Sequence, residues 1–286
     1  MDKKYILSFV LVCTSFVVFG FSMTILGAVL PEIIDGFKWS YTAAGAVFAA
    51  GSISYFISTS VSGILIRKIP LKALLSAGLL LVSVPLFFFG TIPSFIFHIL
   101  LNFCVGFGHG AVEVVANFTV SNIEEKGENK WMSLLHAAFA TGAFIGPVIA
   151  GIILRTDGNW QLAFRIIGAA ALLTGIYALA VHLEHVPVPE KSEKIRHAVG
   201  SIKEKFLLIC TITLLLYVGV EIGISNWISE FFVRITGGGK AAGSMMVSFF
   251  WAGLLAGFLF FATGAVVMLA GSFGIARSEK QNQVKE

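Results

Sequence analysis

The sequence predicts an all-α integral membrane protein with about eight transmembrane helices. The mean hydropathy of its 286 residues is +0.89. Charged residues make up only 13% of the chain, whereas they make up about 25% of an ordinary soluble domain. The 27 Phe and 30 Gly residues suit a lipid-facing surface and close packing between helices. Together these features exclude a soluble globular class.

Eight apolar runs are each long enough to cross about 30 Å of hydrocarbon. We expect every run to be helical, because lipid offers the backbone polar groups no other partners. The first run is too long for a signal peptide, so we expect it to be retained. The runs occupy residues 5–30, 41–66, 71–91, 94–121, 131–154, 162–183, 206–232 and 243–272.

The connections between these runs alternate in charge. Most of the 20 Lys and Arg residues lie on the set of connections that includes the N-terminus. The positive-inside rule therefore predicts a multi-pass protein of the cell membrane with both termini in the cytoplasm. These flanking residues also account for the formal net charge of +4, so no nucleic-acid partner is expected.

The longest connection divides the chain into two unequal parts. Ile195, Val199 and Ile202 recur at helical spacing with charged residues between them, which predicts a short amphipathic helix on the inner leaflet. A solvated linker is the alternative. The expected organisation is a six-helix half at 1–185, a cytoplasmic linker at 186–205, a shorter transmembrane half at 206–275 and a cytoplasmic tail at 276–286.

The seventh and eighth runs repeat the first and second. Residues 19–22 match 218–221, and residues 44–47 match 242–245 at nearly the same offset. The first copy continues through four more spans, whereas the second does not. We therefore expect a six-plus-six architecture from which most of four spans are absent.

Three stretches carry a family resemblance. They are Gly-Phe-Gly-His-Gly at 106–110 followed by Glu113 and Asn117, Gly-Ala-Phe-Ile-Gly-Pro at 142–147, and Tyr-Val-Gly-Val-Glu at 217–221 followed by Asn226 and Trp227. With them the chain resembles the major facilitator superfamily, and within it the fucose/glucose-galactose:proton symporter branch. The resemblance covers essentially the whole chain. It implies the six-helix N-terminal half and a truncated C-terminal half of the major-facilitator fold.

The loop between the second and third spans departs from this family's pattern, Gly-x-x-x-Asp-Arg-x-Gly-x-Lys. Here the loop region holds Gly63, Arg67, Lys68 and Lys72. The resemblance implies a gating role for these four residues at the cytoplasmic face. Arg67 replaces the acid that normally pairs across the loop, so the usual ion pair is not expected.

The fourth span carries a polar stripe. At about 100° per residue, Asn102, His109, Glu113 and Asn117 fall on one narrow face. Polar groups at membrane depth are costly, so this face is expected to line the bundle interior or a water-filled space. We expect Glu113 to carry a proton, and Asn117, Asn102 and His109 to bind a hydroxylated solute. A structural hydrogen-bonded network between helices is the alternative.

Two further spans contain candidate polar residues. Glu221 is a second acid inside an apolar run, and we expect it to take part in proton coupling. The resemblance places Asn226 and Trp227 at a central cavity. Trp227 then stacks on a sugar ring or, alternatively, lies in an interfacial aromatic belt. His136 is the second relay candidate because histidine titrates near neutral pH; a structural role is the alternative.

We see no P-loop, nucleophile elbow or metal-ligand spacing, so neither an enzyme nor a bound metal or cofactor is expected. We expect a proton-coupled secondary transporter of a small hydroxylated solute, such as a sugar, that works by alternating access. Its expected partners are the solute, protons and the lipid bilayer, with homo-oligomerisation left open. The alternatives are a drug/proton antiporter, which shares the Gly-Pro pattern at 142–147, and a non-transporting truncated membrane protein.

Overall fold

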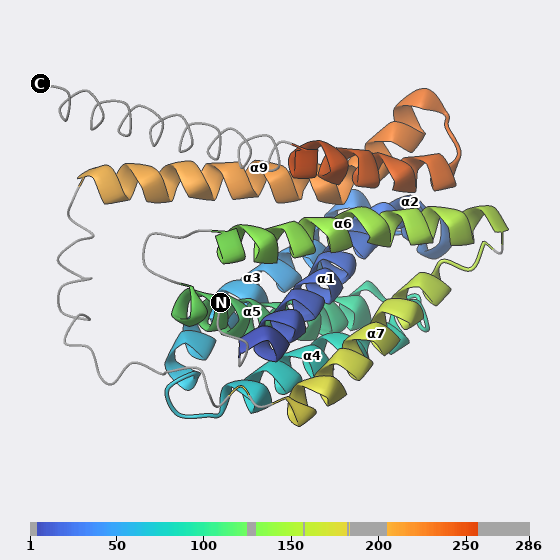
Figure 1. The fold of residues 1–286 in the computed structure, drawn as a ribbon. Helices are drawn as coiled ribbons and strands as arrows, with labels where there is room; N and C mark the ends of the chain where they lie inside the picture. Colours follow the sequence, from blue (N-terminus) through green and yellow to red (C-terminus); the bar gives the residue numbers. More distant parts are fainter. Residues whose placement is uncertain (1–4, 125–129, 157, 182, 184–204, 257–286) are drawn as a thin grey trace, which may run out of the picture.

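A computed structural model describes residues 5–124, 130–156, 158–181, 183 and 205–256 (Figure 1). The predicted amphipathic helix of the linker lies outside these residues. The end of the eighth predicted span and the tail at 276–286 lie outside them as well.

The described chain is a bundle of long helices, which confirms the predicted all-α membrane class. Seven helices are long and apolar enough to span a membrane, and Lys240–Ala256 is a shorter apolar helix at the start of the predicted eighth span. The labelled helices are α1 (Ile6–Ala28), α2 (Leu30–Phe37), α3 (Tyr41–Leu65), α4 (Leu71–Phe88), α5 (Phe95–Ile123), α6 (Lys130–Thr156), α7 (Gln161–Ala180) and α9 (Lys205–Thr236).

Several helix ends follow from local sequence. Ser40 and Ser94 precede α3 and α5, and their hydroxyl oxygens accept hydrogen bonds from backbone amides three residues later, at 3.1 and 3.4 Å. The first predicted span is interrupted at Val29, between α1 and α2. Pro31 lies in the first turn of α2, where its missing amide hydrogen has no helical partner to lose.

Glycines let the helices of the first half touch backbone to backbone. A Cβ added at Gly106 of α5 would lie 2.1 Å from the carbonyl oxygen of Gly51 in α3. A Cβ at Gly142 of α6 would lie 2.0 Å from the carbonyl oxygen of Val17 in α1. These two helix pairs are the most extensive contacts among the described elements. Small residues at such crossings are a general device of membrane helix packing.

Two helix crossings join α9 and the Lys240–Ala256 helix to the six-helix half. At the first, α9 meets α1 at Gly27, where an added Cβ would lie 2.7 Å from the Ser225 carbonyl oxygen. At the second, Ser244 and Ser248 donate hydrogen bonds to carbonyl oxygens of α6 at 3.0 and 2.8 Å. Figure 1 shows α9 and Lys240–Ala256 together on one side of the bundle.

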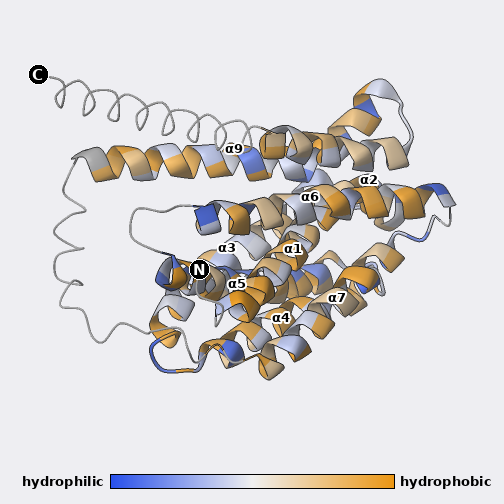
Figure 2. Cartoon of the chain, in the orientation of Figure 1, coloured by the Kyte–Doolittle hydropathy of each residue, from blue (hydrophilic) through white to orange (hydrophobic). Residues whose placement is uncertain are grey.

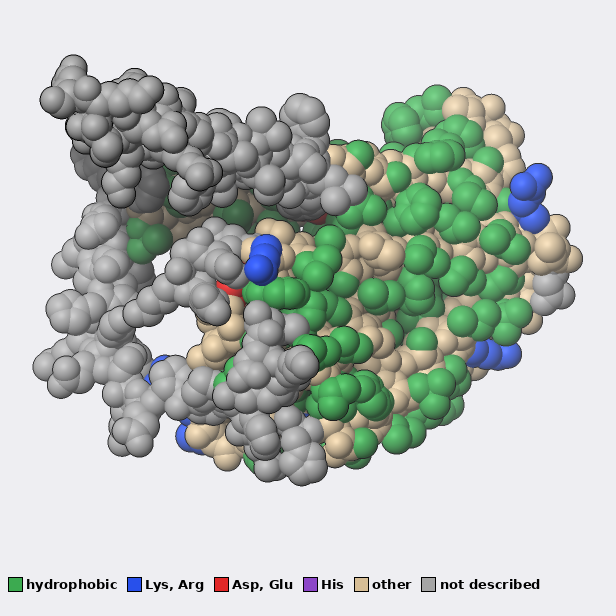
Figure 3. All heavy atoms as spheres, in the orientation of Figure 1, with side chains coloured by type: hydrophobic (Ala, Val, Ile, Leu, Met, Phe, Trp, Pro, Cys, Tyr) green, Lys and Arg blue, Asp and Glu red, His purple; other side chains and the backbone are tan. Residues whose placement is uncertain are grey.

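The first half of α9 makes few contacts, since residues 207–220 are all exposed. Apolar residues predominate along the helices of the bundle (Figure 2). In space-filling view hydrophobic side chains cover much of the visible face, and Lys and Arg lie near its margins (Figure 3). This distribution is the one expected of a surface in contact with lipid.

The α1–α6 crossing gives a direct test of the packing. We predict that Gly142→Ala lowers the stability of the protein in detergent by about 1–3 kcal/mol, the usual cost of overpacking, because the helices must separate. Thermal unfolding followed by size-exclusion chromatography measures the change. Gly63→Ala in α3 is the matched control, since nothing lies within 4 Å of its added Cβ. An equal loss of stability in both variants would contradict the assigned crossing.

Candidate functional site

A cavity of about 510 Å³ lies between the first half of the bundle and α9. It borders α1, α3, α5 and α9, and its lining combines hydroxyl, amide and imidazole groups with apolar side chains. Among the described residues that form the wall there is no Asp, Glu, Lys or Arg. The polar side chains on the wall are Ser22, Ser52, Tyr55, Asn102, His109 and Asn226. The wall is therefore mainly apolar with six polar side chains, and it is formally uncharged when His109 is neutral.

Three residues of the predicted polar stripe differ in the hydrogen bonds that their side chains form. His109 is buried, and its Nε2 lies 2.6 Å from the Ser22 hydroxyl of α1. Asn102 donates from Nδ2 to the Val47 carbonyl oxygen at 2.8 Å. Asn117 forms no side-chain hydrogen bond with the part of the chain that the structure describes, and it does not line the cavity. Asn102 therefore keeps its carbonyl oxygen as an acceptor, whereas His109 is already engaged.

Glu113 lies directly behind the cavity wall. The Tyr55 hydroxyl donates to a carboxylate oxygen of Glu113, and the Tyr55 side chain itself lines the cavity. The two residues come from α3 and α5, which pack against each other more extensively than any other pair of described helices. Tyr55 thus connects the carboxylate with whatever occupies the cavity.

The residues predicted on α9 divide between two faces. Asn226 lines the cavity, together with Ile222 and Gly223 one turn earlier. Glu221 lies on another face of the helix and interacts with Tyr217. Trp227 packs against Tyr41 and Phe48 of α3, with ring centroids 5.9 and 5.8 Å apart. Trp227 therefore supports the wall rather than forming it.

The remaining predicted residues lie away from the cavity. His136 of α6 is exposed, and its ring meets the edge of Phe16 with centroids 5.9 Å apart. Gly63 is exposed near the end of α3, and Arg67 and Lys68 are exposed in the loop that follows. Lys72 lies in the first turn of α4. The structure does not bring these groups to the central site.

Three polar residues of the wall, Ser22, Ser52 and Tyr55, were missed in the sequence. Ser22 and Tyr55 supply hydroxyls to His109 and Glu113. Each lies in a helix with several other hydroxyl side chains, such as Ser15 in α1 and Ser58 in α3, so residue type alone does not distinguish it. A helical projection of the first and second spans, like the one made for the fourth, offers the signal that could have found them.

One end of the cavity is closed where α1 and α9 cross. The Ser229 hydroxyl donates to the Ala28 carbonyl oxygen at 3.1 Å. Ser225, one turn earlier, accepts a hydrogen bond from the Trp251 indole at 2.9 Å. The Ser229 bond and the backbone contact at Gly27 hold α9 against the first half beside the last wall residue, Asn226. The Trp251 bond holds α9 against the Lys240–Ala256 helix.

Comparisons with known proteins agree with this architecture. Multidrug resistance protein 1 of Bacillus subtilis is 28% identical over 81% of this chain and 59% of its own length. The human sodium-dependent glucose transporter 1 is 20% identical over 84% of this chain and 53% of its own length. The crystal structure of a D-xylose-proton symporter superposes with a TM-score of 0.62 at 14% identity, covering 92% of this chain and 69% of that one.

The chain spans a little over half the length of these two relatives. The sequence profile of the Major Facilitator Superfamily matches residues 12–277, a range that includes every wall residue of the cavity. The chain belongs to the Major Facilitator Superfamily.

Proposed function

We propose that this chain forms part of a proton-coupled secondary transporter for a small, uncharged, hydroxylated solute. Transport proceeds by alternating access, with both termini in the cytoplasm. The observation that carries this proposal is an uncharged cavity with several polar side chains on its wall, one of which, Tyr55, donates a hydrogen bond to the carboxylate of Glu113.

The chemistry of the wall favours neutral solutes with several hydroxyl groups. Asn226 offers an amide with no hydrogen bond to other described residues, and Asn102 offers a free carbonyl oxygen. Met23, Leu26 and Phe48 supply apolar surface suited to the C–H faces of a sugar. A volume of about 510 Å³ lies within the range typical of small-molecule sites, roughly 300–1,000 Å³. The glucose transporter and the D-xylose symporter among the similar proteins support the same solute class.

Tyr55 provides the physical link between solute and proton. Its hydroxyl donates to Glu113 when the carboxylate is charged. A solute hydroxyl that bonds to Tyr55 changes this interaction, and protonation of Glu113 removes the charge that Tyr55 stabilises. Binding of the solute therefore alters the affinity of Glu113 for a proton. Protonation of Glu113 alters the affinity for the solute by the same factor, because such coupling is reciprocal by thermodynamic necessity.

This coupling predicts the behaviour of Glu113→Gln. The variant keeps a hydrogen-bond acceptor for Tyr55 but has no carboxyl group that can gain and lose a proton, so we expect uptake driven by a pH gradient to fall to the level of empty vesicles. The measurement is uptake of radiolabelled hexoses and pentoses into proteoliposomes, with and without the gradient. Uptake that the gradient still stimulates would contradict the role of Glu113.

Two further variants refine this assignment. Tyr55→Phe removes a hydrogen bond to a charged group, worth roughly 1.5–3 kcal/mol, and is expected to weaken coupling while folding is retained. Glu221→Gln makes the same change at the second acid of the apolar runs, which does not line the cavity. If Glu221→Gln abolishes coupling and Glu113→Gln does not, the proton site belongs on α9.

A drug/proton antiporter is the second candidate. The 28% identity to Multidrug resistance protein 1 and the apolar share of the wall favour it. It predicts export of hydrophobic cations such as ethidium, which an efflux assay on the same proteoliposomes measures. Sugar uptake without ethidium efflux supports the symporter, and the converse supports the antiporter. Inactivity of the folded chain toward both solutes would favour the non-transporting alternative.

A further inference from the structure

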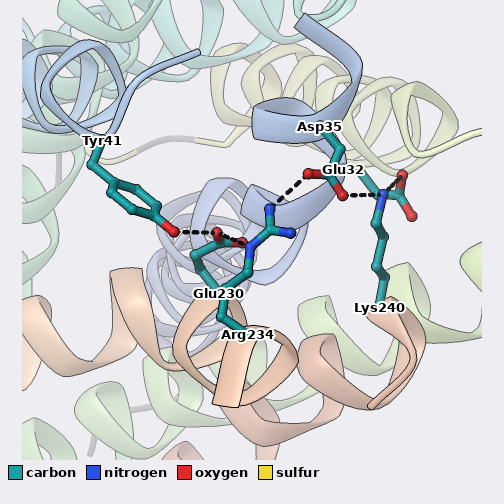
Figure 4. Close-up of polar contacts among 6 residues, drawn as sticks. All are labelled: Glu32, Asp35, Tyr41, Glu230, Arg234 and Lys240. Carbon is teal, nitrogen blue, oxygen red and sulfur yellow. Dashed lines mark hydrogen bonds and ion pairs between the residues drawn. The ribbon is translucent and has the colours of Figure 1, made fainter. Parts of the chain in front are cut away.

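A network of charged side chains lies at the closed end of the cavity. It joins α2, α3 and α9 to the beginning of the Lys240–Ala256 helix (Figure 4). Lys240 contacts Glu32 at 3.1 Å and Asp35 at 2.9 Å. Arg234 contacts Asp35 at 2.6 Å. These ion pairs connect the first half of the bundle with the second.

The network is placed to control access to the cavity. On α9 the last wall residue is Asn226, and Glu230 and Arg234 follow one and two turns later. On α3 the first wall residue is Phe48, and Tyr41 precedes it by about two turns. The network therefore lies between the cavity and this end of the bundle, next to the crossing of α1 and α9 at Gly27.

Arg234 divides its hydrogen bonds between the two halves. Its Nη2 reaches Asp35 on α2, whereas its Nε reaches Oε1 of Glu230 on its own helix at 2.7 Å. Tyr41 donates to the same Oε1 at 3.1 Å. Glu230 is only 3% exposed, yet its second oxygen, Oε2, has no hydrogen-bond partner among the residues that the structure describes. An ionised oxygen left unpaired in a buried site is costly.

We propose that Arg234 is a two-position latch for which Glu230 Oε2 is the vacant second position. With this end closed, the guanidinium bridges Asp35 and Glu230. When the halves separate, Arg234 leaves Asp35 and pairs with both oxygens of Glu230 in the bidentate geometry that suits guanidinium and carboxylate. Arg234 then keeps an anionic partner in both states, which lowers the free-energy difference between them.

The proposal gives Asp35 and Glu230 opposite roles although both bind Arg234. Asp35 stabilises only the closed state, so Asp35→Asn is expected to open this end. Glu230→Gln retains one oxygen for Tyr41 and Arg234 but removes the vacant acceptor needed in the open state. It is therefore expected to keep this end closed, and to reverse the opening when combined with Asp35→Asn.

Labelling of a cysteine in the cavity tests this proposal in the full chain. Cys13, Cys104 and Cys210 are replaced by Ala, and Ser52→Cys on the wall becomes the reporter. A membrane-impermeant maleimide is applied to each face of vesicles, and a cysteine at exposed Lys38 identifies the latch side. The readout requires no transported solute, so it is independent of the proposed function.

We expect Asp35→Asn to raise the rate of labelling from the latch side by at least about fivefold, the lower end of typical coupling between conformational states. Lys240→Gln, which removes the other cation bound to Asp35, should act in the same direction. Arg155→Gln is the charge control, because exposed Arg155 forms no ion pair with any residue in the described ranges. Size-exclusion chromatography verifies that each variant is folded.

Each result decides one part of the proposal. An unchanged labelling rate in folded Asp35→Asn and Lys240→Gln would overturn the latch. Faster labelling in Glu230→Gln, comparable to that in Asp35→Asn, would overturn the second position and leave Glu230 as a further closed-state contact. Slow labelling in Glu230→Gln and in the double variant supports the two-position assignment.

The latch is also predicted to be insensitive to pH near neutrality. Hydrogen bonds from Arg234 and then Lys240 hold the pKa of Asp35 below its usual range. A carboxylate with a lowered pKa gives its full stabilisation of the closed state at any pH above the ordinary pKa of Asp, about 3.9. This stabilisation is lost only as the pH falls through the lowered pKa. The ratio of labelling rates between Asp35→Asn and the parent should therefore stay constant from about pH 5 to 8. A ratio that falls within this window would contradict the Asp35 ion pairs.

Discussion

The cost of placing polar groups at membrane depth governs this structure. In hydrocarbon each such group needs an internal partner or contact with water. Serine hydroxyls meet this requirement by donating to carbonyl oxygens across helix crossings, as Ser76 and Ser83 of α4 do to α7 at 2.8 Å. The same requirement places Ser22 beside His109 and Tyr55 beside Glu113. The polar wall of the cavity is thus continuous with the contacts that hold the helices together.

The glycine contacts that hold the helices together also position the residues of the cavity wall. Gly106 brings α5 against α3, and the helices lying against each other there carry Asn102, His109 and Tyr55 to the wall. Gly27 brings α9 against α1 and closes one end. Toward the N-terminal end of α9, residues 207–220 are exposed within the part of the chain that the structure describes. A central site closed by contacts at one end is the arrangement from which alternating access operates.

The sequence predicted the helices well because their signal is local. Apolar runs of sufficient length identify most spans within a few residues. The polar stripe of the fourth span was also accessible, because one helix carries all of it. Two of its members, Asn102 and His109, line the cavity, whereas Glu113 reaches the cavity through Tyr55.

Partners on different helices could not be predicted in this way. Glu32 and Lys240 are 208 residues apart, and nothing local indicates that α2 ends beside the Lys240–Ala256 helix. The side of α9 that faces the cavity depends on its crossing with α1, so the sequence could not separate Asn226, which lines the wall, from Glu221, which does not. His136 was proposed from its titration range alone, and the fold leaves it outside the cavity.

The central claim is that Glu113 exchanges a proton with water through the cavity. Infrared difference spectroscopy of the protein in lipid, recorded during a pH titration, tests this claim directly. We expect a protonated-carboxyl band that shifts in D2O and is missing from Glu113→Gln. A Glu113 carboxyl band that never titrates, or one that does not respond to D2O, would show that this carboxyl is sealed from water and would contradict the account.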